Sequence, residues 1–218
     1  MARLAKRVWD HRALTVETKC RVYQACVLSP LLYGSETWTA YSRQERRLNT
    51  FHMRCLKRLF NIDWKERITH EQILKRAKLP SLQALLSQRR LRWLGHVWRM
   101  DDGRMPKDIL YGQLVKGSRK QGRPFLRFKD VCKRDMRICS IATDTWESDA
   151  NDRTSWRQRL IQGIADADQK RFSSAAEKRD RRKQSSSAEL PSSVFICPQC
   201  NRDCHSRIGL FSHNKKCR

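Results

Sequence analysis

Apolar residues recur at helical spacing through the first hundred residues of the chain, which predicts a series of amphipathic helices. In the segment that begins at Ser42, apolar side chains return every three or four residues as far as Leu59, and Glu45 follows Ser42 as in a capping box. Thr69 and Gln72 repeat that capping pattern ahead of a shorter helix. The sequence therefore predicts helix starts at Ser42 and Thr69.

Further helices are expected on both sides of these two. Residues 16–28 form an amphipathic pattern that Pro30 breaks or restarts, and two more helices are predicted over 126–139 and from near Thr154. A further helix, capped by Ser81, is predicted between the segments 16–28 and 126–139. The side chains expected to face inward from that helix are Leu82, Leu85, Leu86, Trp93, Leu94 and Val97.

Two stretches interrupt the helical pattern. Glycine and proline recur throughout residues 101–124, so we expect a loop there with a short hairpin. Residues 173–193 are rich in serine, alanine and charge, with a basic run at 178–183, and predict a disordered or weakly helical linker. The expected fold class is therefore mainly α: a helical domain over 1–172, a flexible linker over 173–193, and a small ββα zinc finger over 194–218.

The chain carries a large excess of positive charge. Its 218 residues include 47 Lys and Arg against 22 Asp and Glu, a formal net charge of +25, and residues 1–140 alone hold 32 basic and 12 acidic side chains. This balance excludes an ordinary neutral enzyme and favours a partner that carries phosphates. The plainer alternative is that these cations only solvate helix faces. No apolar stretch fits a membrane-spanning helix, so no membrane partner is expected.

The strongest chemical signal lies at the carboxyl end of the sequence. Its four candidate ligands have the spacing C-x2-C-x12-H-x3-C and are Cys197, Cys200, His213 and Cys217. The first two thiols suit a tight hairpin, and the last two ligands, four residues apart, share one face of a helix. Four such ligands can surround a zinc ion tetrahedrally. So short a module buries too little surface to fold alone, which is why we expect it to depend on zinc.

Three alternatives to this zinc site stay open. Cys204 stands where such fingers usually carry an aromatic residue, and it could compete as a ligand. A retroviral knuckle, C-x2-C-x4-H-x4-C, is satisfied by Cys197, Cys200 and His205, but Leu210 stands at its last position. The third alternative is that the thiols bind nothing. Residues 1–12 lack the apolar run typical of a secretory signal, so the nine cysteines are expected to be reduced.

The helix of the finger lacks side chains suited to reading bases. Its base-reading positions are Ser206, Gly209 and Ser212, none of which offers a long bidentate donor. Binding to RNA or DNA is therefore expected to use phosphates and to be weakly selective for sequence. The predicted contacts are basic side chains of both the helical domain and the finger: Arg89, Arg90, Arg92, Arg119, Lys120, Arg123, Arg207, Lys215 and Lys216.

No catalytic motif is recognisable in the sequence. Asp101 and Asp102 resemble the paired aspartates of a polymerase palm, but they follow the end of a predicted helix and lack the strand-turn-strand context that such a pair needs. P-loop, nucleophile-elbow and zinc-protease motifs are missing as well. We therefore expect that the protein is not an enzyme.

Several motifs resemble a known family. Residues 31–38, LLYGSETW, and 91–100, LRWLGHVWRM, are similar to the carboxyl-terminal part of LINE-type non-LTR retrotransposon reverse transcriptases, from the thumb onward. Further matching pieces are RKQGRP at 119–124, Lys129-Asp130, Asp152-Arg153 and Trp156-Arg157. In that family the endonuclease and the catalytic palm lie upstream of this part. The resemblance therefore implies a non-catalytic remnant, with a thumb-like domain that grips a template–primer duplex and a finger that binds RNA or target DNA.

The preferred function is thus that of a zinc-dependent nucleic-acid-binding protein, a non-catalytic remnant of a retrotransposon reverse transcriptase. Two alternatives are a fragment that assists a polymerase in trans and a zinc-finger module that binds proteins. The basic run at 178–183 suits a nuclear localisation signal or a phosphate-binding patch, so the nucleus is the expected location, with the cytoplasm second.

Overall fold

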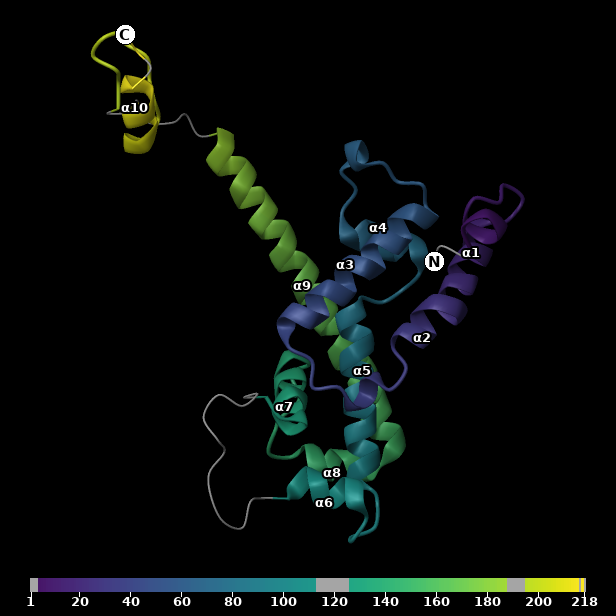
Figure 1. Cartoon of the computed structure of the whole chain (residues 1–218). Coiled ribbons are helices and arrows are strands. Elements are labelled where there is room, and N and C mark those ends of the chain that lie inside the picture. The colour runs from purple at the N-terminus through teal and green to yellow at the C-terminus, as the bar shows by residue number, and fades with distance from the viewer. Residues whose placement is uncertain (1–3, 113–125, 188–194, 216, 218) are drawn as a thin grey trace. The chain divides into compact units, whose positions relative to one another are not determined.

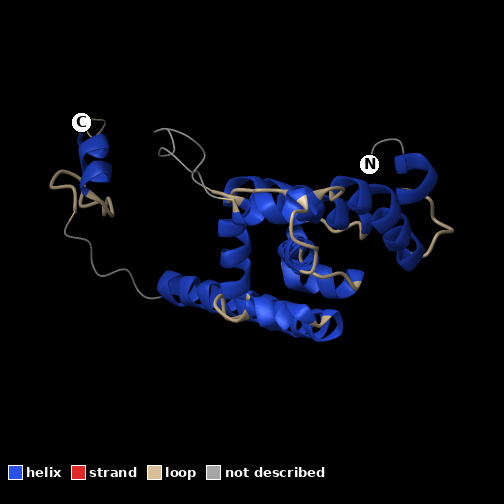
Figure 2. Cartoon of the chain, turned by 90° about the horizontal axis from the view of Figure 1, so that it is seen from below, coloured by secondary structure: helices blue, strands red, loops and turns tan. Residues whose placement is uncertain are grey.

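The computed structural model describes residues 4–112, 126–187, 195–215 and 217 (Figure 1). Contacts divide the chain into two compact units, Met1–Phe172 and Ser173–Arg218. Helices make up most of the described residues, which contain no strand (Figure 2), so the prediction of a mainly α fold is confirmed. Within this part of the chain, no helix combines the length and the apolar character needed to cross a membrane.

The described residues form a succession of α-helices. They are α1 (Val16–Tyr23), α2 (Ser29–Leu31), α3 (Ser42–Leu59), α4 (His70–Ala77), α5 (Leu82–Trp98), α6 (Met105–Tyr111), α7 (Phe128–Ile138), α8 (Trp146–Asn151), α9 (Arg153–Ser187) and α10 (Arg207–Asn214). Shorter π-helical and 3-10 segments lie at Ala5–Trp9, Gln24–Leu28, Ser35–Thr37 and Trp64–Glu66.

The predicted caps of α4 and α5 are present. Thr69 Oγ1 accepts a hydrogen bond from the backbone N–H of Gln72 at 3.3 Å, and the Gln72 side chain accepts one from the Thr69 N–H at 3.0 Å. At α5, Ser81 Oγ accepts from the Ala84 N–H at 3.1 Å. Each bond satisfies a backbone donor that has no partner inside the helix.

The cap predicted for α3 is wrong by one residue. Ser42 is the first helical residue, and the preceding Tyr41 is the N-cap, with its backbone N–H donating to the Gln44 side chain at 2.8 Å. The sequence pattern predicted that the Glu45 side chain would cap the start of this helix, but Glu45 is buried. Its carboxylate is used in a tertiary contact described below.

Helix α5 takes part in two hydrophobic cores. Its first half contributes Leu82 and Leu86 to a core shared with α1, α3 and α4. Its second half contributes Leu91 and Leu94 to a core shared with α7, α8 and the first part of α9 (Figure 1). Burial of these apolar side chains is the main force that holds the surrounding helices on α5.

The approach of α9 to α5 depends on Gly95. A Cβ atom added there would lie 2.4 Å from Nε1 of Trp156, so the indole ring occupies the space that any other residue would fill. The same Nε1–H donates to the backbone carbonyl of Leu91 at 3.1 Å, which satisfies the buried indole nitrogen. Glycine at position 95 therefore allows the two helices to pack this closely.

A buried ion network joins α3, α5 and α7. The side chain of Arg90 is 1% exposed and lies 2.7 Å from Asp135 and 3.1 Å from Glu45. Arg134 also reaches Glu45, at 2.8 Å. Two buried carboxylates thus neutralise a buried guanidinium, and removal of one partner would leave an uncompensated charge in the interior. The prediction that Arg90 contacts nucleic acid is wrong for this reason.

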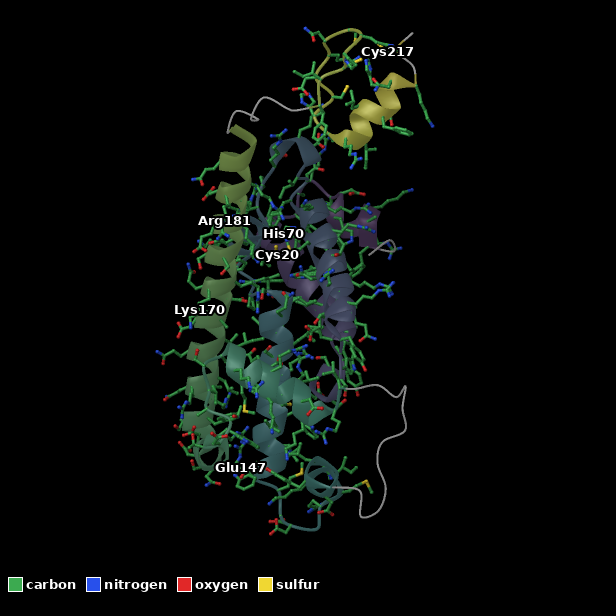
Figure 3. The ribbon with its side chains drawn as sticks, turned by 90° about the vertical axis from the view of Figure 1, so that its left-hand side faces the viewer. Cys20, His70, Glu147, Lys170, Arg181 and Cys217 are labelled. Carbon is green, nitrogen blue, oxygen red and sulfur yellow. The ribbon has the colours of Figure 1, made fainter. Side chains whose placement is uncertain are left out.

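Two expected irregular segments contain helices. The loop predicted over 101–124 includes α6, and its remaining part beyond Gly112 lies outside the described residues. The linker predicted from residue 173 is helical as far as Ser187, because α9 continues through it; Figure 3 labels Lys170 and Arg181 on this helix. Alanine, lysine, arginine and glutamate dominate the sequence before the serine run, and these residues have high helix propensity.

Candidate metal centre and basic surface

A short hairpin precedes α10 in the terminal unit. A single antiparallel bridge joins Ile196 to Asp203, so the two strands of the expected ββα finger are absent from the described residues. The backbone N–H of Cys197 donates to Arg202 at 2.9 Å, which closes the hairpin. Because Cys197 and Cys200 lie on this tight turn, their thiols can face the same point.

Helix α10 supplies the other pair of candidate ligands. Ser206 caps it, with its hydroxyl oxygen accepting from the Gly209 N–H at 3.0 Å. His213 lies in the last turn, and the N–H of Cys217 donates to the His213 carbonyl at 2.8 Å. This bond continues the helical turn past the end of α10, which keeps the two side chains on the same side.

The four predicted ligands converge. The ligand atoms of Cys197, Cys200, His213 and Cys217 all lie within 4.8 Å of one another. Figure 3 labels Cys217 close to the helix and the hairpin of this unit. Cys200 Sγ lies 3.1 Å from His213 Nε2, and Cys197 Sγ lies 4.0 Å from Cys217 Sγ. A tetrahedral ion with metal–sulfur bonds of about 2.3 Å would place two sulfurs about 3.8 Å apart, so the donor set fits zinc.

The environment of the thiols also favours a cation. Backbone N–H groups, that of Gln199 first, stabilise the Cys197 thiolate and lower its pKa. The pKa of Cys217 is raised to about 11, mainly by its hydrogen bond to Cys200 and further by burial and by the Cys197 thiol beside it. Thiols so close to one another resist ionising together, and a bound dication removes that resistance. Metal binding is therefore expected to release protons.

The alternative ligands lie outside this cluster. Cys204 Sγ contacts the backbone carbonyl of Arg202 at 3.7 Å. The His205 ring lies 3.4 Å from the carboxylate of Asp203, on the hairpin. Neither belongs to the group of side chains that can share one ion, so the geometry favours the quartet with His213 over the knuckle spacing.

None of the base-reading positions at α10 carries a long side chain with two hydrogen-bond donors. Ser206 uses its hydroxyl oxygen to cap the helix. At Gly209, an added Cβ would lie 2.3 Å from the backbone carbonyl oxygen of Cys204, so the hairpin excludes a longer residue there. Ser212 is exposed but short. Exposed apolar residues stand nearby instead, since Ile208 is 79% and Phe211 is 65% exposed.

The predicted basic contacts differ in availability. Arg92 is exposed on α5, and Arg207 and Lys215 are exposed at the two ends of α10. Arg89 is half-buried, and its guanidinium donates to the Leu32 carbonyl at 2.6 Å. The remaining predicted contacts lie outside the described residues and are Arg119, Lys120, Arg123 and Lys216.

The paired aspartates take part in a local ion pair. Asp102 lies 2.6 Å from Lys107, whose hydrogen bond and charge lower the pKa of that carboxyl. Asp101 is exposed in the same turn after α5. The pair therefore marks the end of that helix, as its sequence context indicates.

One group of residues was missed by the sequence reasoning. Trp93 was assigned to the inward stripe of its helix, but it is half-buried and lines a cavity between α5, α6 and α7. Tyr111 and Phe128 line the same cavity. One signal in the sequence could have shown that Trp93 is not fully buried. His96 follows Trp93 by three residues on the same helix face, and this polar residue is exposed in the structure.

Comparison with curated proteins finds a relative of transposon origin. It is an uncharacterized transposon-derived protein of Caenorhabditis elegans, 27% identical over 145 residues. The aligned part covers 63% of this chain and 52% of the nematode protein, so the chain spans about half the length of that relative. Neither a known protein family nor a solved structure matches the chain. The similarity therefore links this chain to a transposon-derived protein. The name of that relative states no biochemical role, so a role for this chain has to be argued from its candidate site.

Proposed function

We propose that this chain is a non-catalytic nucleic-acid-binding part of a LINE-type retrotransposon reverse transcriptase, with a zinc ion in its terminal unit. The observation that carries the proposal is the convergence of Cys197, Cys200, His213 and Cys217 in a unit that also exposes basic side chains. The resemblance of residues 31–38 and 91–100 to that family supports it, as does the similarity to a transposon-derived protein.

Binding is proposed to act through phosphates. The chain has a net charge of +25, and Arg92, Arg207 and Lys215 are exposed. The helix that would read bases instead presents Gly209 and Ser212, which cannot reach a base edge with two donors. Such an interface holds the nucleic-acid backbone of many sequences with similar affinity. A nuclear location fits this role.

The salt dependence of binding tests the proposal. Affinities for labelled single-stranded RNA, duplex DNA and RNA–DNA hybrid are measured at several salt concentrations. If roughly 5 to 8 phosphates are neutralised, log affinity should fall with log salt at a slope of about −4 to −7. A flat dependence would contradict the proposal.

Two variants sharpen this test. Arg207→Gln removes an exposed cation and should make the slope about one unit less steep. Arg21→Gln is the control, because Arg21 is paired with Glu17 at 3.1 Å, and it should leave the slope unchanged. A strong sequence preference that disappears in Ser212→Ala would show that the finger reads bases.

The non-catalytic part of the proposal has its own assay. Purified protein mixed with a template–primer duplex and nucleotides should incorporate none, because Asp101 and Asp102 end a helix and Asp102 is held by Lys107. Incorporation that survived purification and disappeared in Asp101→Asn would overturn this expectation.

A second candidate function has one specific observation in its favour. Ile208 and Phe211 are exposed and one helical turn apart on α10, which suits a protein-binding surface. Replacement of both by serine should leave nucleic-acid affinity unchanged within about twofold under the preferred proposal, which assigns affinity to phosphate contacts. If the wild-type protein binds no nucleic acid at all, the protein-binding module becomes the better proposal.

A further inference from the structure

A cavity of about 850 Å³ lies in the helical unit and is lined mainly by residues of α5, α6 and α7. Ligand pockets commonly have volumes of roughly 300 to 1,000 Å³, so this one can hold part of a small or polymeric ligand. None of its lining residues belongs to the terminal metal cluster. The chemistry of its walls indicates which ligand it would accept.

Aromatic rings form part of the wall. Trp93, Tyr111 and Phe128 line the cavity from three different helices. Trp98, Trp146 and Trp156 lie in the second core of the same unit, where ring packs against ring with centroids 5.9 and 6.2 Å apart. Trp93 is instead half-buried beside the exposed His96, at 5.3 Å between ring centroids. Its ring therefore lines the cavity and is only partly covered by the protein, which leaves aromatic surface for a flat group to contact.

The apolar character extends to the mouth of the cavity. Met105 and Ile109 line it from α6, and each is 73% exposed. Apolar side chains this accessible are costly to leave in water unless a ligand covers them. They suit the face of a ring better than they suit a charged group.

Cations line the same cavity from the start of α7. Arg127, Lys129 and Lys133 are three positive groups beside one carboxylate, Asp130. Asp130 accepts hydrogen bonds from the Arg127 guanidinium at 3.1 Å. Lys129 Nζ lies 5.0 Å from the centre of the Tyr111 ring, and Lys133 is exposed one turn further along the helix. The net charge of this wall is positive and would attract phosphates.

We propose that this cavity binds an unpaired nucleobase of a single-stranded nucleic acid. Trp93 stacks on the base, while Lys129 and Lys133 contact the neighbouring phosphates. The inference rests on the proposed nucleic-acid binding and adds the class of strand. Bases in a duplex are covered on both faces by their neighbours, whereas a single strand can turn a base outward onto an aromatic ring. A purely apolar ligand would make no use of the net positive charge of this wall.

Paired affinity measurements test this inference. The full chain is titrated with a fluorescent twelve-nucleotide oligouridine, with oligothymidine of the same length, and with a duplex of the same length, at one fixed salt concentration. Trp93→Ala should weaken binding of both single strands by roughly 5- to 150-fold, the effect of losing one stacked base. Duplex binding should change by less than about twofold.

Three further variants keep the test sharp. Trp93→Phe retains a stacking ring and should restore most of the single-strand affinity, which a merely destabilised protein would not do. Tyr33→Ala removes an 85% exposed aromatic residue that does not line the cavity, and it should change nothing. Lys133→Gln leaves the core intact and should make the single-strand salt slope less steep by about 0.7.

The outcomes separate this inference from the function it rests on. If wild-type protein binds single strands and duplex with a steep salt slope, but Trp93→Ala and Lys133→Gln affect both ligands equally or not at all, the cavity is not a base-binding site and the proposed function stands. If the wild-type protein binds no nucleic acid, both are overturned.

Discussion

Single buried polar residues connect the helices of the first core. The hydroxyl of Tyr23 on α1 is hydrogen-bonded to Nδ1 of His52 on α3 at 2.7 Å. Among the described residues, the other ring nitrogen of His52 is buried without a partner. Burial disfavours the charged imidazolium, which lowers the pKa of His52 to about 4. This residue is therefore neutral in the folded protein through the physiological pH range.

The first prediction concerns the pH dependence of stability at His52. Its pKa is about 4 when folded, against an ordinary value of about 6.5. Between these values the unfolded chain binds a proton that the native state does not, so stability falls as pH falls. From pH 7 to pH 5 the loss should be about 2 kcal/mol. Urea unfolding at both values measures it.

Two replacements of histidine by uncharged glutamine control this prediction. Between pH 7 and pH 5, the free energy of unfolding of His52→Gln should fall by about 2 kcal/mol less than that of the wild type, since the titrating group is gone. His11→Gln removes an exposed histidine and should behave as the wild type does. Equal pH dependence of stability in all three proteins would show that folding does not lower the pKa of His52.

At the level of elements, the terminal hairpin and α10 bring four candidate metal ligands together with little apolar packing of their own. The hairpin has one bridge, and Leu210 and Phe195 are only half-buried, so the unit has little apolar surface to stabilise it. A structural metal is the usual substitute for a core in a module of this size. The metal is thus expected to be required for the fold of this unit.

Cobalt binding provides the second prediction. The full chain titrated with Co²⁺ should give the absorption of a tetrahedral ion with three thiolates and one imidazole, because Cys197, Cys200, Cys217 and His213 can share one ion. Cys217→Ser should weaken that spectrum and the affinity. Cys204→Ser is the matched control, since Cys204 lies outside the cluster, and it should preserve both. The reverse pattern would reassign the ligands.

At the level of the whole molecule, the helical unit has its own cores. The buried apolar residues of both cores lie at or before residue 167, and α5 contributes to each. The Arg90 network adds a buried link between α3, α5 and α7. The helical unit should therefore unfold cooperatively, and its stability should not depend on whether the terminal unit has bound a metal ion.

Tryptophan fluorescence gives the third prediction. All seven tryptophans lie between Trp9 and Trp156, so their emission reports only on the helical unit. Thermal melts of the full chain with zinc and with excess chelator should give Tm values within about 2 °C of each other, because neither core contains any of the four candidate metal ligands. For comparison, Leu91→Ala removes a fully buried side chain and should lower Tm clearly, at a cost of about 2 to 5 kcal/mol. A large shift on chelation would show that the two units are energetically coupled.

Local sequence patterns predicted what local physics decides. The periodicity of apolar residues identified most of the helices, and the Thr69–Gln72 box and the Ser81 cap mark starts that depend on bonds within one turn. The ligand spacing at the carboxyl end predicted the metal cluster for the same reason, since a tight turn and a helical turn bring the four groups together. These features depend on residues that are near in sequence.

Only the tertiary structure decided which polar and aromatic side chains are buried. Arg90 reads as one more surface cation in a basic helix, and it is buried because Glu45 and Asp135 reach it from two other helices. Gly95 looks like a weak point in α5, and it is required because Trp156 crosses there. Trp93 borders a cavity because α6 and α7 leave space beside it. Contacts between distant segments leave no periodic signal in the sequence, so the cavity and the buried ion network could not be predicted from it.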